Sequence, residues 1–422
     1  MSPANVHVTS PPPTWVGHEQ GKIVRTDFAA QLRRHRSERG VTQQTAARGM
    51  GVERATLTQW ESGRHLPSPE KVRVIDDYYG AGGVLTALAE AARTGTAAQP
   101  LPRLLLLTNV FAAVGRGLVR HLIADAAGRP LGWCHNLGTG TTPTPLSTSY
   151  VIRTLLLLDE AAVDLGPVIS RVKERQVGGG WSNRIDGPPR PEVTEVVVDA
   201  LSRLGADADL AAAWHSLESS IDTVARERPY VLTTVLETAV RIRPDSPFVT
   251  RLIDDLLVAR KDCGHVLLWP ATAAPGIARV EASLVHTARA VTVLKAAQAA
   301  VDRPDVDEAV GQAVEWIVAR DRADDGVTEI LRDPDSRRLD VPINHFTSPW
   351  VLRALAGSEG VPGPRVQAAL TMLWDSYSPI DGLWAWTHDG TLPTWMTYDA
   401  IAALRVAALA SFRTPITATP GE

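Results

Sequence analysis

The chain has 422 residues and a mass of 45.4 kDa, enough for two or three domains of ordinary size. Hydrophobic residues make up 44% and charged residues 21%, a composition that excludes an intrinsically disordered chain. The two cysteines, Cys134 and Cys263, lie far apart and in no CxxC motif, which excludes a disulfide framework and a zinc-finger grid. We therefore expect a cytoplasmic protein, with neither a secretory signal nor a membrane-spanning segment.

Charge is distributed unevenly along the chain. Residues 21–93 carry 12 Lys and Arg against 8 Asp and Glu, a net charge of +4. The rest of the chain has a net charge of -8. The first segment therefore suits a polyanionic partner such as DNA, and the remainder does not.

Residues 1–20 contain three consecutive prolines and no apolar period, which indicates a disordered tail. Within 21–93, four short segments of helical pattern follow, each ending at a glycine: Gly40, Gly51, Gly63 and Gly80. Ser68 and Pro69 are an N-cap and a first helical residue for the fourth helix. We expect a small all-α domain over residues 21–93.

Residues 94–103 are rich in small residues and proline and are read as a linker. Residues 104–412 are dominated by Ala, Leu and Val at helical spacing, with almost no alternation of period two. A helix, a turn with Gly or Trp, a polar loop and a second helix recur, and six such hairpins fit the segment. We expect a helical repeat domain that closes or is capped, followed by a tail over 413–422.

The short stretches QLRRHRSERG, VTQQ and WESGRHLPSPE occur in residues 27–80 with fixed spacing. They resemble the phage-repressor and Cro-type (XRE) helix-turn-helix family. The resemblance implies that the second helix crosses the phosphate backbone and that the third lies in the major groove of double-stranded DNA. It also implies a structural ion pair between Arg36 and Glu61, which joins helix 1 to helix 3.

The apolar residues of this segment can share one core if Leu57 and Trp60 point inward. The residues left on the outer face of the third helix are then Arg54, Ala55, Thr56, Thr58 and Gln59. Gln59 can pair with adenine and Arg54 with guanine, whereas Thr42, Gln43 and Arg64 are candidates for phosphate contacts. Glu53, at the start of this helix, would repel DNA, and a role in protein contacts alone remains an alternative.

The turns GGGW and LGW, each followed by a helix of the form TxxxxxAL, resemble the α/α-toroid of terpene cyclases and protein prenyltransferases. Together with the N-terminal segment this gives the expected fold class: all-α, a helix-turn-helix domain followed by an α/α-toroid. The acidic DxDD motif of the cyclases does not occur in the sequence. Asp262, Cys263 and His286 do not have the zinc spacing of the prenyltransferases, so we expect no catalytic residue, no metal and no cofactor.

Ten of the twelve tryptophans lie in the repeat domain, several of them in its turns. Matching repeat positions make Trp181, Trp269, Trp384 and Trp386 candidates for lining a ligand cavity. His286 and His345 are further candidates for this cavity. The alternative is that these tryptophans only attach turns to neighbouring helices.

These observations predict a homodimeric, sequence-specific transcriptional regulator. In this interpretation the toroid has no enzymatic activity and either senses a small apolar ligand or mediates dimerisation. Two alternatives remain at the sequence level: an isoprenoid-processing enzyme fused to a DNA-binding domain, and a protein-interaction scaffold.

Overall fold

The computed structural model describes most of the chain and divides it into two compact units, Met1–Val110 and Phe111–Glu422. The expected tail over 1–20 and residues 414–422 lie outside the described residues. The described residues are 28–29, 31–33, 35–37, 39–79, 81, 84–94, 100–160, 163–183, 187–206, 210–224, 228–273, 281–320, 328–332, 340–356, 358, 363–378, 380–386 and 389–413.

The first unit is built from short helices with local start and stop signals. Helical residues within 28–37 come first, followed by α2 (Gln43–Gly49), α3 (Arg54–Glu61), α4 (Pro69–Tyr79) and α5 (Val84–Thr94). The Thr42 side chain caps α2, and the Ser68 hydroxyl accepts from the Lys71 amide at the start of α4. Gly51 and Gly63 have φ angles of 65° and 71°. This left-handed conformation favours glycine, and a residue that adopts it ends the preceding helix.

One small core holds this unit together. Leu57 and Trp60 of α3 are buried against Leu32 and against Val72 and Ile75 of α4. Val41 and Val52 pack at its edge, and Phe28, Leu85 and Leu88 extend it. The inward orientation predicted for Leu57 and Trp60 is thus confirmed, and it leaves the opposite face of α3 to solvent.

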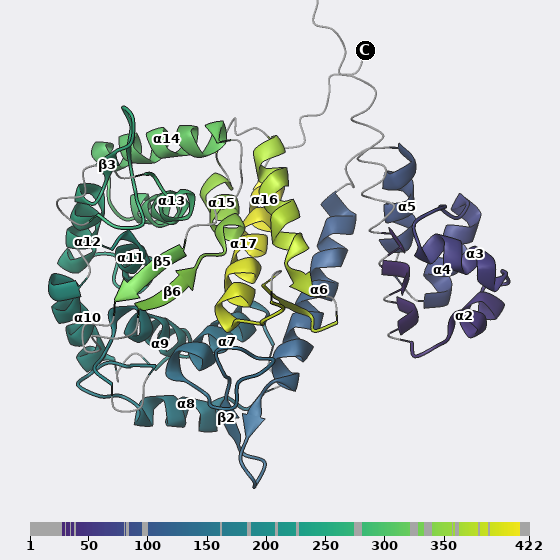
Figure 1. Ribbon diagram of the computed structural model, residues 1–422, viewed down its shortest axis with the longest axis horizontal. Helices are drawn as coiled ribbons and strands as arrows, with labels where there is room; N and C mark the ends of the chain where they lie inside the picture. The colour runs from purple at the N-terminus through teal and green to yellow at the C-terminus, as the bar shows by residue number, and fades with distance from the viewer. Residues whose placement is uncertain are drawn as a thin grey trace, which may run out of the picture. The chain divides into compact units, whose positions relative to one another are not determined.

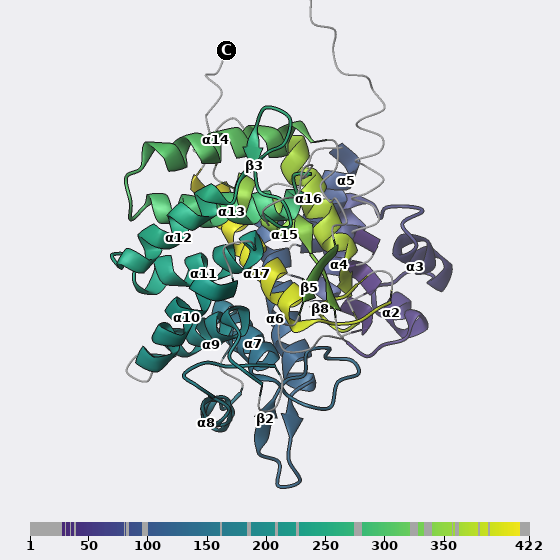
Figure 2. The same cartoon turned by 60° about the vertical axis from the view of Figure 1, so that its left-hand side comes forward.

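The second unit is an α/α-toroid, two concentric layers of helices (Figures 1 and 2). Each inner helix contacts the next, and the last contacts the first, so the ring closes. The inner helices are α7 (Pro145–Leu157), α9 (Pro191–Arg203), α11 (Pro229–Ile242), α13 (Leu284–Gln298), α15 (Thr347–Leu355) and α17 (Thr394–Arg413). The outer helices are α6 (Pro100–Arg120), which belongs to this unit from Phe111 onward, α8 (Gly166–Glu174), α10 (Ala211–Val224), α12 (Pro247–Val258), α14 (Pro304–Ala319) and α16 (Gly363–Asp375).

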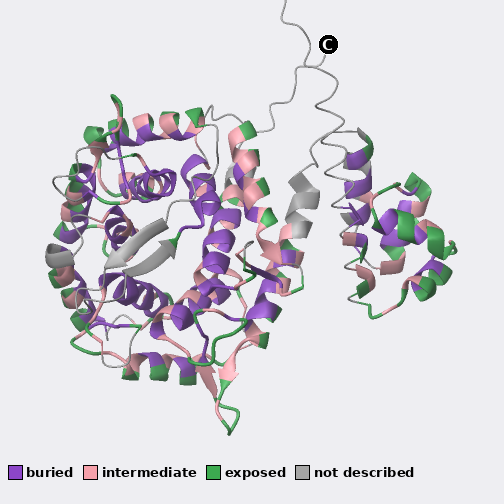
Figure 3. Ribbon diagram, in the orientation of Figure 1, coloured by how far each residue is buried: buried purple, intermediate pink, exposed green. Residues whose placement is uncertain are grey.

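The inner helices have neighbours on nearly every side, so most of their residues, apolar and charged alike, are buried (Figure 3). Antiparallel two-stranded hairpins lead from an outer to an inner helix in the described part of the unit. They are β1 (Ile123–Ala124) with β2 (Pro130–Gly132), β3 (Lys261–Asp262) with β4 (Leu267–Leu268), β5 (Thr328–Arg332) with β6 (Asp340–Asn344), and β7 (Tyr377–Ser378) with β8 (Leu383–Trp384). α6 begins at Pro100, inside the segment 94–103 expected to be a linker.

In four of the six pairs of outer and inner helices, a tryptophan attaches the connecting turn to the outer helix. The indole Nε1 of Trp269 donates to the Leu256 carbonyl of α12 at 2.8 Å, and the side chain has no exposed surface. The same bond, at 2.7–2.9 Å, joins Trp133 to Leu118, Trp181 to Val172 and Trp384 to Leu373. These bonds explain why the tryptophan recurs in the sequence.

A threonine of the following inner helix completes each of these turns. The Thr148 and Thr194 hydroxyls accept from the backbone N–H of Trp133 and Trp181, at 3.1 and 3.0 Å. A Cβ on the glycine before either tryptophan would lie 2.6–2.7 Å from that hydroxyl. In these two turns the glycine therefore leaves room for the threonine hydroxyl, which in turn binds the backbone of the tryptophan.

Substitution of Trp269 by phenylalanine is expected to lower the free energy of unfolding by about 1–3 kcal/mol, because the Leu256 carbonyl loses its donor and a void remains. Chemical denaturation of the full chain measures this. Trp316→Phe is the matched control: Trp316 is half-buried on α14 and stacks against Arg320. An equal loss of stability in both variants would contradict the role given to Trp269.

Candidate functional site

The first candidate site is the exposed face of α3 in the N-terminal unit. Arg54, Ala55, Thr58 and Gln59 are exposed and Thr56 is half-buried, whereas Leu57 and Trp60 face the core. Glu53 is exposed at the N-cap position and makes no side-chain capping bond. The structure therefore brings the predicted base-contacting residues together on one solvent-facing helix surface.

The residues predicted to contact phosphate are placed differently from one another. Arg64 is exposed, just beyond α3. The Thr42 hydroxyl accepts from the Thr45 amide at 3.2 Å and so serves the start of α2. The Gln43 amide donates to Glu61 Oε2 at 2.7 Å and lies 3.4 Å from the Thr58 hydroxyl. Of these three side chains, Gln43 is thus held inside the unit, where it sets the position of α2 against α3.

Arg36 and Glu61 form an ion pair between the first helical segment and the end of α3. Arg36 Nε and Nη2 donate to the two carboxylate oxygens at 2.6 and 3.2 Å, and Glu61 is 3% exposed. The hydrogen bond to Glu61 raises the pKa of Arg36. Because Gln43 donates to the same carboxylate, Glu61 fixes three helical segments in the orientation that presents α3.

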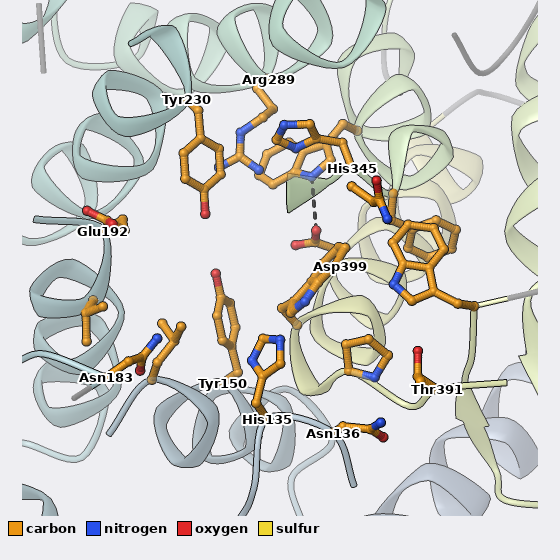
Figure 4. A pocket seen from close by; sticks show the side chains of 18 of the residues that line it. His135, Asn136, Tyr150, Asn183, Glu192, Tyr230, Arg289, His345, Thr391 and Asp399 are labelled. Carbon is orange, nitrogen blue, oxygen red and sulfur yellow. Dashed lines mark hydrogen bonds between the residues drawn. The ribbon is translucent and has the colours of Figure 1, made fainter. Parts of the chain in front are cut away.

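The second candidate site is a cavity of about 510 Å³ in the toroid (Figure 4). Its walls come from the N-terminal halves of inner helices and from the loops that precede them. The lining residues are His135, Asn136, Leu146, Tyr150, Asn183, Arg190, Glu192, Val193, Tyr230, Arg289, Asn344, His345, Phe346, Trp350, Trp386, Asp389, Thr391, Pro393, Trp395 and Asp399. Polar side chains are more numerous among these residues than in the aromatic and apolar lining predicted from the sequence, although aromatic and apolar side chains also form part of the wall.

Of the four tryptophans predicted to line a cavity, Trp386 does so. Trp269 and Trp384 are fully buried in the attachments described above, and Trp181 borders only a smaller hollow beside α8. This corrects the prediction for these three residues. Their indoles are oriented toward the outer helices because the buried N–H needs the carbonyl there.

The two histidines singled out in the sequence lie together at the edge of the cavity. His345 lines it, and the rings of His286 and His345 meet edge to face with centroids 4.9 Å apart. His286 Nδ1 is 2.8 Å from the Ser283 hydroxyl, as in a hydrogen-bonded core histidine. Asp262 and Cys263 lie apart from it, at the β3–β4 hairpin, and no group of three metal-ligating side chains is found among the described residues.

A layer of ion pairs lies among the inner helices. Arg153 Nε of α7 is 2.6 Å from Asp199 Oδ2 of α9, and both side chains are at least 97% buried. Arg353 of α15 pairs with Glu237 of α11. Arg289 of α13 donates to the Thr234 hydroxyl at 2.7 Å and lies over the Trp350 ring, 3.9 Å from its centroid. Charged side chains at these positions thus join neighbouring inner helices, and the Arg353 pair also links α15 to α11.

Two carboxyl groups near this layer have raised pKa values. Burial raises the pKa of Asp399 to about 6, with Arg289 and Arg353 opposing the shift. Burial raises the pKa of Glu195 to about 8, so this group is mostly protonated at neutral pH. Burial lowers the pKa of His135, which is therefore a neutral imidazole at neutral pH.

The sequence reasoning missed Tyr150, Arg289 and Asp399, although a signal for them exists. Each stands two residues after the recurring threonine of its inner helix, which is Thr148, Thr287 or Thr397. That repeat position faces the cavity, and a polar residue there interrupts an apolar helix.

Comparison with known proteins gives one family match and several similar structures. Residues 27–89 match the family model of a helix-turn-helix domain. No match was found among curated proteins. A crystal structure of a protein from Actinoplanes is 20% identical, with a TM-score of 0.44, over 71% of this chain and 99% of that one.

Two further solved structures of similar fold are enzymes. The type II terpene cyclase MstE from Scytonema is 17% identical, with a TM-score of 0.47, over 72% of this chain and 98% of that one. The GH76A α-1,6-mannanase of Salegentibacter sp. HEL1_6 is 9% identical, with a TM-score of 0.48, over 72% of this chain and 99% of that one. No described helix of the present chain is long and apolar enough to cross a membrane. Because residues 27–89 match the family model named above, this segment of the chain is a helix-turn-helix domain.

Proposed function

We propose that this chain is a sequence-specific DNA-binding regulator of the XRE type, whose toroid is a non-catalytic domain that binds a small ligand and mediates homodimerisation. The observation that carries the DNA-binding part is the exposed face of α3, with Arg54 and Gln59 facing solvent. The positive charge of residues 21–93 supports an approach to the phosphate backbone.

The cavity supports a ligand-binding role for the toroid. A volume of about 510 Å³ with aromatic walls and convergent polar groups is typical of a small-molecule site. The charged groups beside it are engaged in pairs that join inner helices, which suits a structural role for them. Two chains are needed because repressors of this type read two half-sites about one helical turn apart.

Native mass spectrometry of the gently purified full chain tests the toroid part of this proposal. The expected result is a mass of two chains of 45.4 kDa each, together with a retained small molecule. A monomer without any retained molecule would contradict both the dimer and the sensing role. Release of a cyclised product from geranylgeranyl diphosphate would contradict the non-catalytic role instead.

A further inference from the structure

Asp399 is the polar centre of the cavity floor. Its Oδ2 accepts from the Trp350 indole at 3.1 Å, and Trp350 is its one hydrogen-bond donor among the residues that the structure describes. The side chain is 6% exposed, and its carboxylate faces the middle of the cavity (Figure 4). The second oxygen is thus available to a donor on a bound molecule.

Two phenol groups flank this carboxylate. The hydroxyls of Tyr150 and Tyr230 point toward the middle of the cavity from opposite walls (Figure 4). The Tyr150 hydroxyl has no hydrogen bond to another described residue, and burial raises its pKa, so it keeps its proton. A group that both donates to Asp399 and accepts from Tyr150 would satisfy both side chains, and a hydroxyl does this.

The charges on the cavity floor are offset within the protein. Arg190 pairs with Glu192 at the wall. Arg289 and Arg353 favour the ionised form of Asp399 electrostatically, and Arg289 also lies over the Trp350 and Tyr230 rings. Asp389 is exposed at the rim, where solvent screens its charge. A ligand with a full charge would therefore find no unopposed opposite charge on the floor to offset the cost of its desolvation.

Part of the cavity wall beside these polar groups is aromatic. Trp386 and Trp395 meet edge to face with ring centroids 5.7 Å apart, and Phe346 lies 6.5 Å from Trp386. Together with Leu146 and Pro393 they form an apolar surface for the body of a ligand.

We propose that the cavity binds an uncharged hydroxylated molecule, with one ligand hydroxyl donating to Asp399 and accepting from Tyr150 while the ligand body packs on Trp386 and Trp395. The inference rests on the ligand-binding role proposed above and names its chemistry. Sugars and hydroxylated terpenoids share this chemistry, and the arms of the experiment separate them.

The proposal implies a defined pH dependence. A ligand hydroxyl donates to the ionised form of Asp399, whose pKa is about 6, so affinity should fall roughly tenfold from pH 7 to pH 5. Replacement of Asp399 by asparagine separates this titration from that of His135. The groups that face Asp399 from the surrounding elements are Tyr150 of α7, Tyr230 and Glu237 of α11, Arg289 of α13, Trp350 and Arg353 of α15, and His135 and His345 of the loops.

Tryptophan fluorescence titration of the full chain with four probes of one ten-carbon body tests the head-group chemistry. The probes are myrcene, geraniol, geranylamine and geranyl diphosphate, with trehalose as the sugar arm. Geraniol or trehalose is expected to bind at least about tenfold more tightly than the other three. Asp399→Asn and Tyr150→Phe should each weaken that binding by about tenfold, and Asp399→Asn should abolish its pH dependence.

Asp375→Asn and Tyr377→Phe are matched controls outside the cavity and should bind as the parent does. Circular dichroism shows whether each variant folds. If Asp399→Asn does not fold, the binding measured with Tyr150→Phe decides the test. Tighter binding of the amine, the diphosphate or the hydrocarbon, unchanged binding in both cavity variants, or no binding of either hydroxylated probe would overturn the proposal. If only a charged probe binds, or if native mass spectrometry retains a molecule while no hydroxylated probe binds, the toroid still binds a ligand but the hydroxyl chemistry proposed here is wrong. If no probe binds and no molecule is retained, both the hydroxyl chemistry and the ligand-binding role are wrong.

Discussion

Replacement of Asp199 by alanine is expected to lower the free energy of unfolding of the toroid by about 3–5 kcal/mol. Asp199 is 1% exposed, and its carboxylate forms ion pairs with three arginines. The nitrogen–oxygen distances are 2.6 Å to Arg153, 2.7 Å to Arg241 and 2.9 Å to Arg203. Arg203 and Arg241 are about 30% exposed and can be solvated without it, but Arg153 is 3% exposed. The variant would leave the guanidinium of Arg153 buried without its counter-charge.

In the parent chain, the neighbouring carboxyl of Glu195 is a weaker partner for Arg153 than Asp199 is. Glu195 lies 3.7 Å from Arg153 and is mostly protonated at neutral pH, because burial raises its pKa to about 8. For Asp199, burial also favours the neutral form, but Arg153, Arg203 and Arg241 outweigh it and lower the pKa. A lowered pKa means that the stabilisation is present at neutral pH and is lost as the pH falls below the ordinary range of aspartate.

Urea denaturation at pH 7, pH 4 and pH 3 measures this effect. Because the pKa of Asp199 is lowered, the deficit of Asp199→Ala relative to the parent should be nearly the same at pH 7 and pH 4 and should shrink at pH 3. Glu195→Gln keeps the shape of a protonated carboxyl, and Arg203→Ala removes a partly exposed partner, so both controls should cost about 1 kcal/mol or less. If Arg203→Ala proved as destabilising as Asp199→Ala, the central role of the Arg153 pair would be wrong.

Gln59→Ala and Arg54→Ala are each expected to weaken binding to a specific operator by about 1–3 kcal/mol, because in the proposed complex each side chain makes a bidentate contact to a base edge. Both side chains are exposed on α3 and neither belongs to the core of the unit, so the variants should fold normally. Binding to unrelated duplexes should change little, since phosphate contacts carry most of the non-specific affinity.

Competition binding at fixed salt concentration, with operator and scrambled duplexes, separates the two effects. Arg73→Ala is the control for Arg54→Ala, because it removes the same charge from an exposed position of α4. It should lower the affinity for both duplexes alike, if at all. Equal discrimination between operator and scrambled duplex in the parent and in both α3 variants would remove these residues from the base-contacting surface.

The helix-turn-helix unit could be predicted from the sequence because its determinants are local. Gly51 and Gly63 end helices through their own backbone conformation, and Ser68 and Pro69 start one. The partners of its core lie within about sixty residues, so the spacing of Leu57 and Trp60 was enough to orient α3.

The toroid could be predicted as a repeat, and attachment of turns to helices was one of the two roles considered for its tryptophans, but which tryptophan has which role could not be predicted. Trp269 and Trp386 both stand in turns after an outer helix, yet one indole is bound to the Leu256 carbonyl and the other lines the cavity. The difference depends on where the carbonyl of a preceding helix lies, which the spacing of residues in the sequence does not specify.

The composition of the cavity was also beyond the sequence reasoning. Tyr150, Arg289 and Asp399 come from three repeats that span 250 residues, and each alone is one polar residue in an apolar helix. Only closure of the ring through the contact of α17 with α7 brings them around one space.

Selection of duplexes by the full chain from a random pool tests the central claim most directly, that α3 reads base sequence. We expect enrichment of an operator with two related half-sites about one helical turn apart, and a changed or lost preference at one position of each half-site with Gln59→Ala. A pool that stays random after repeated selection would contradict the claim.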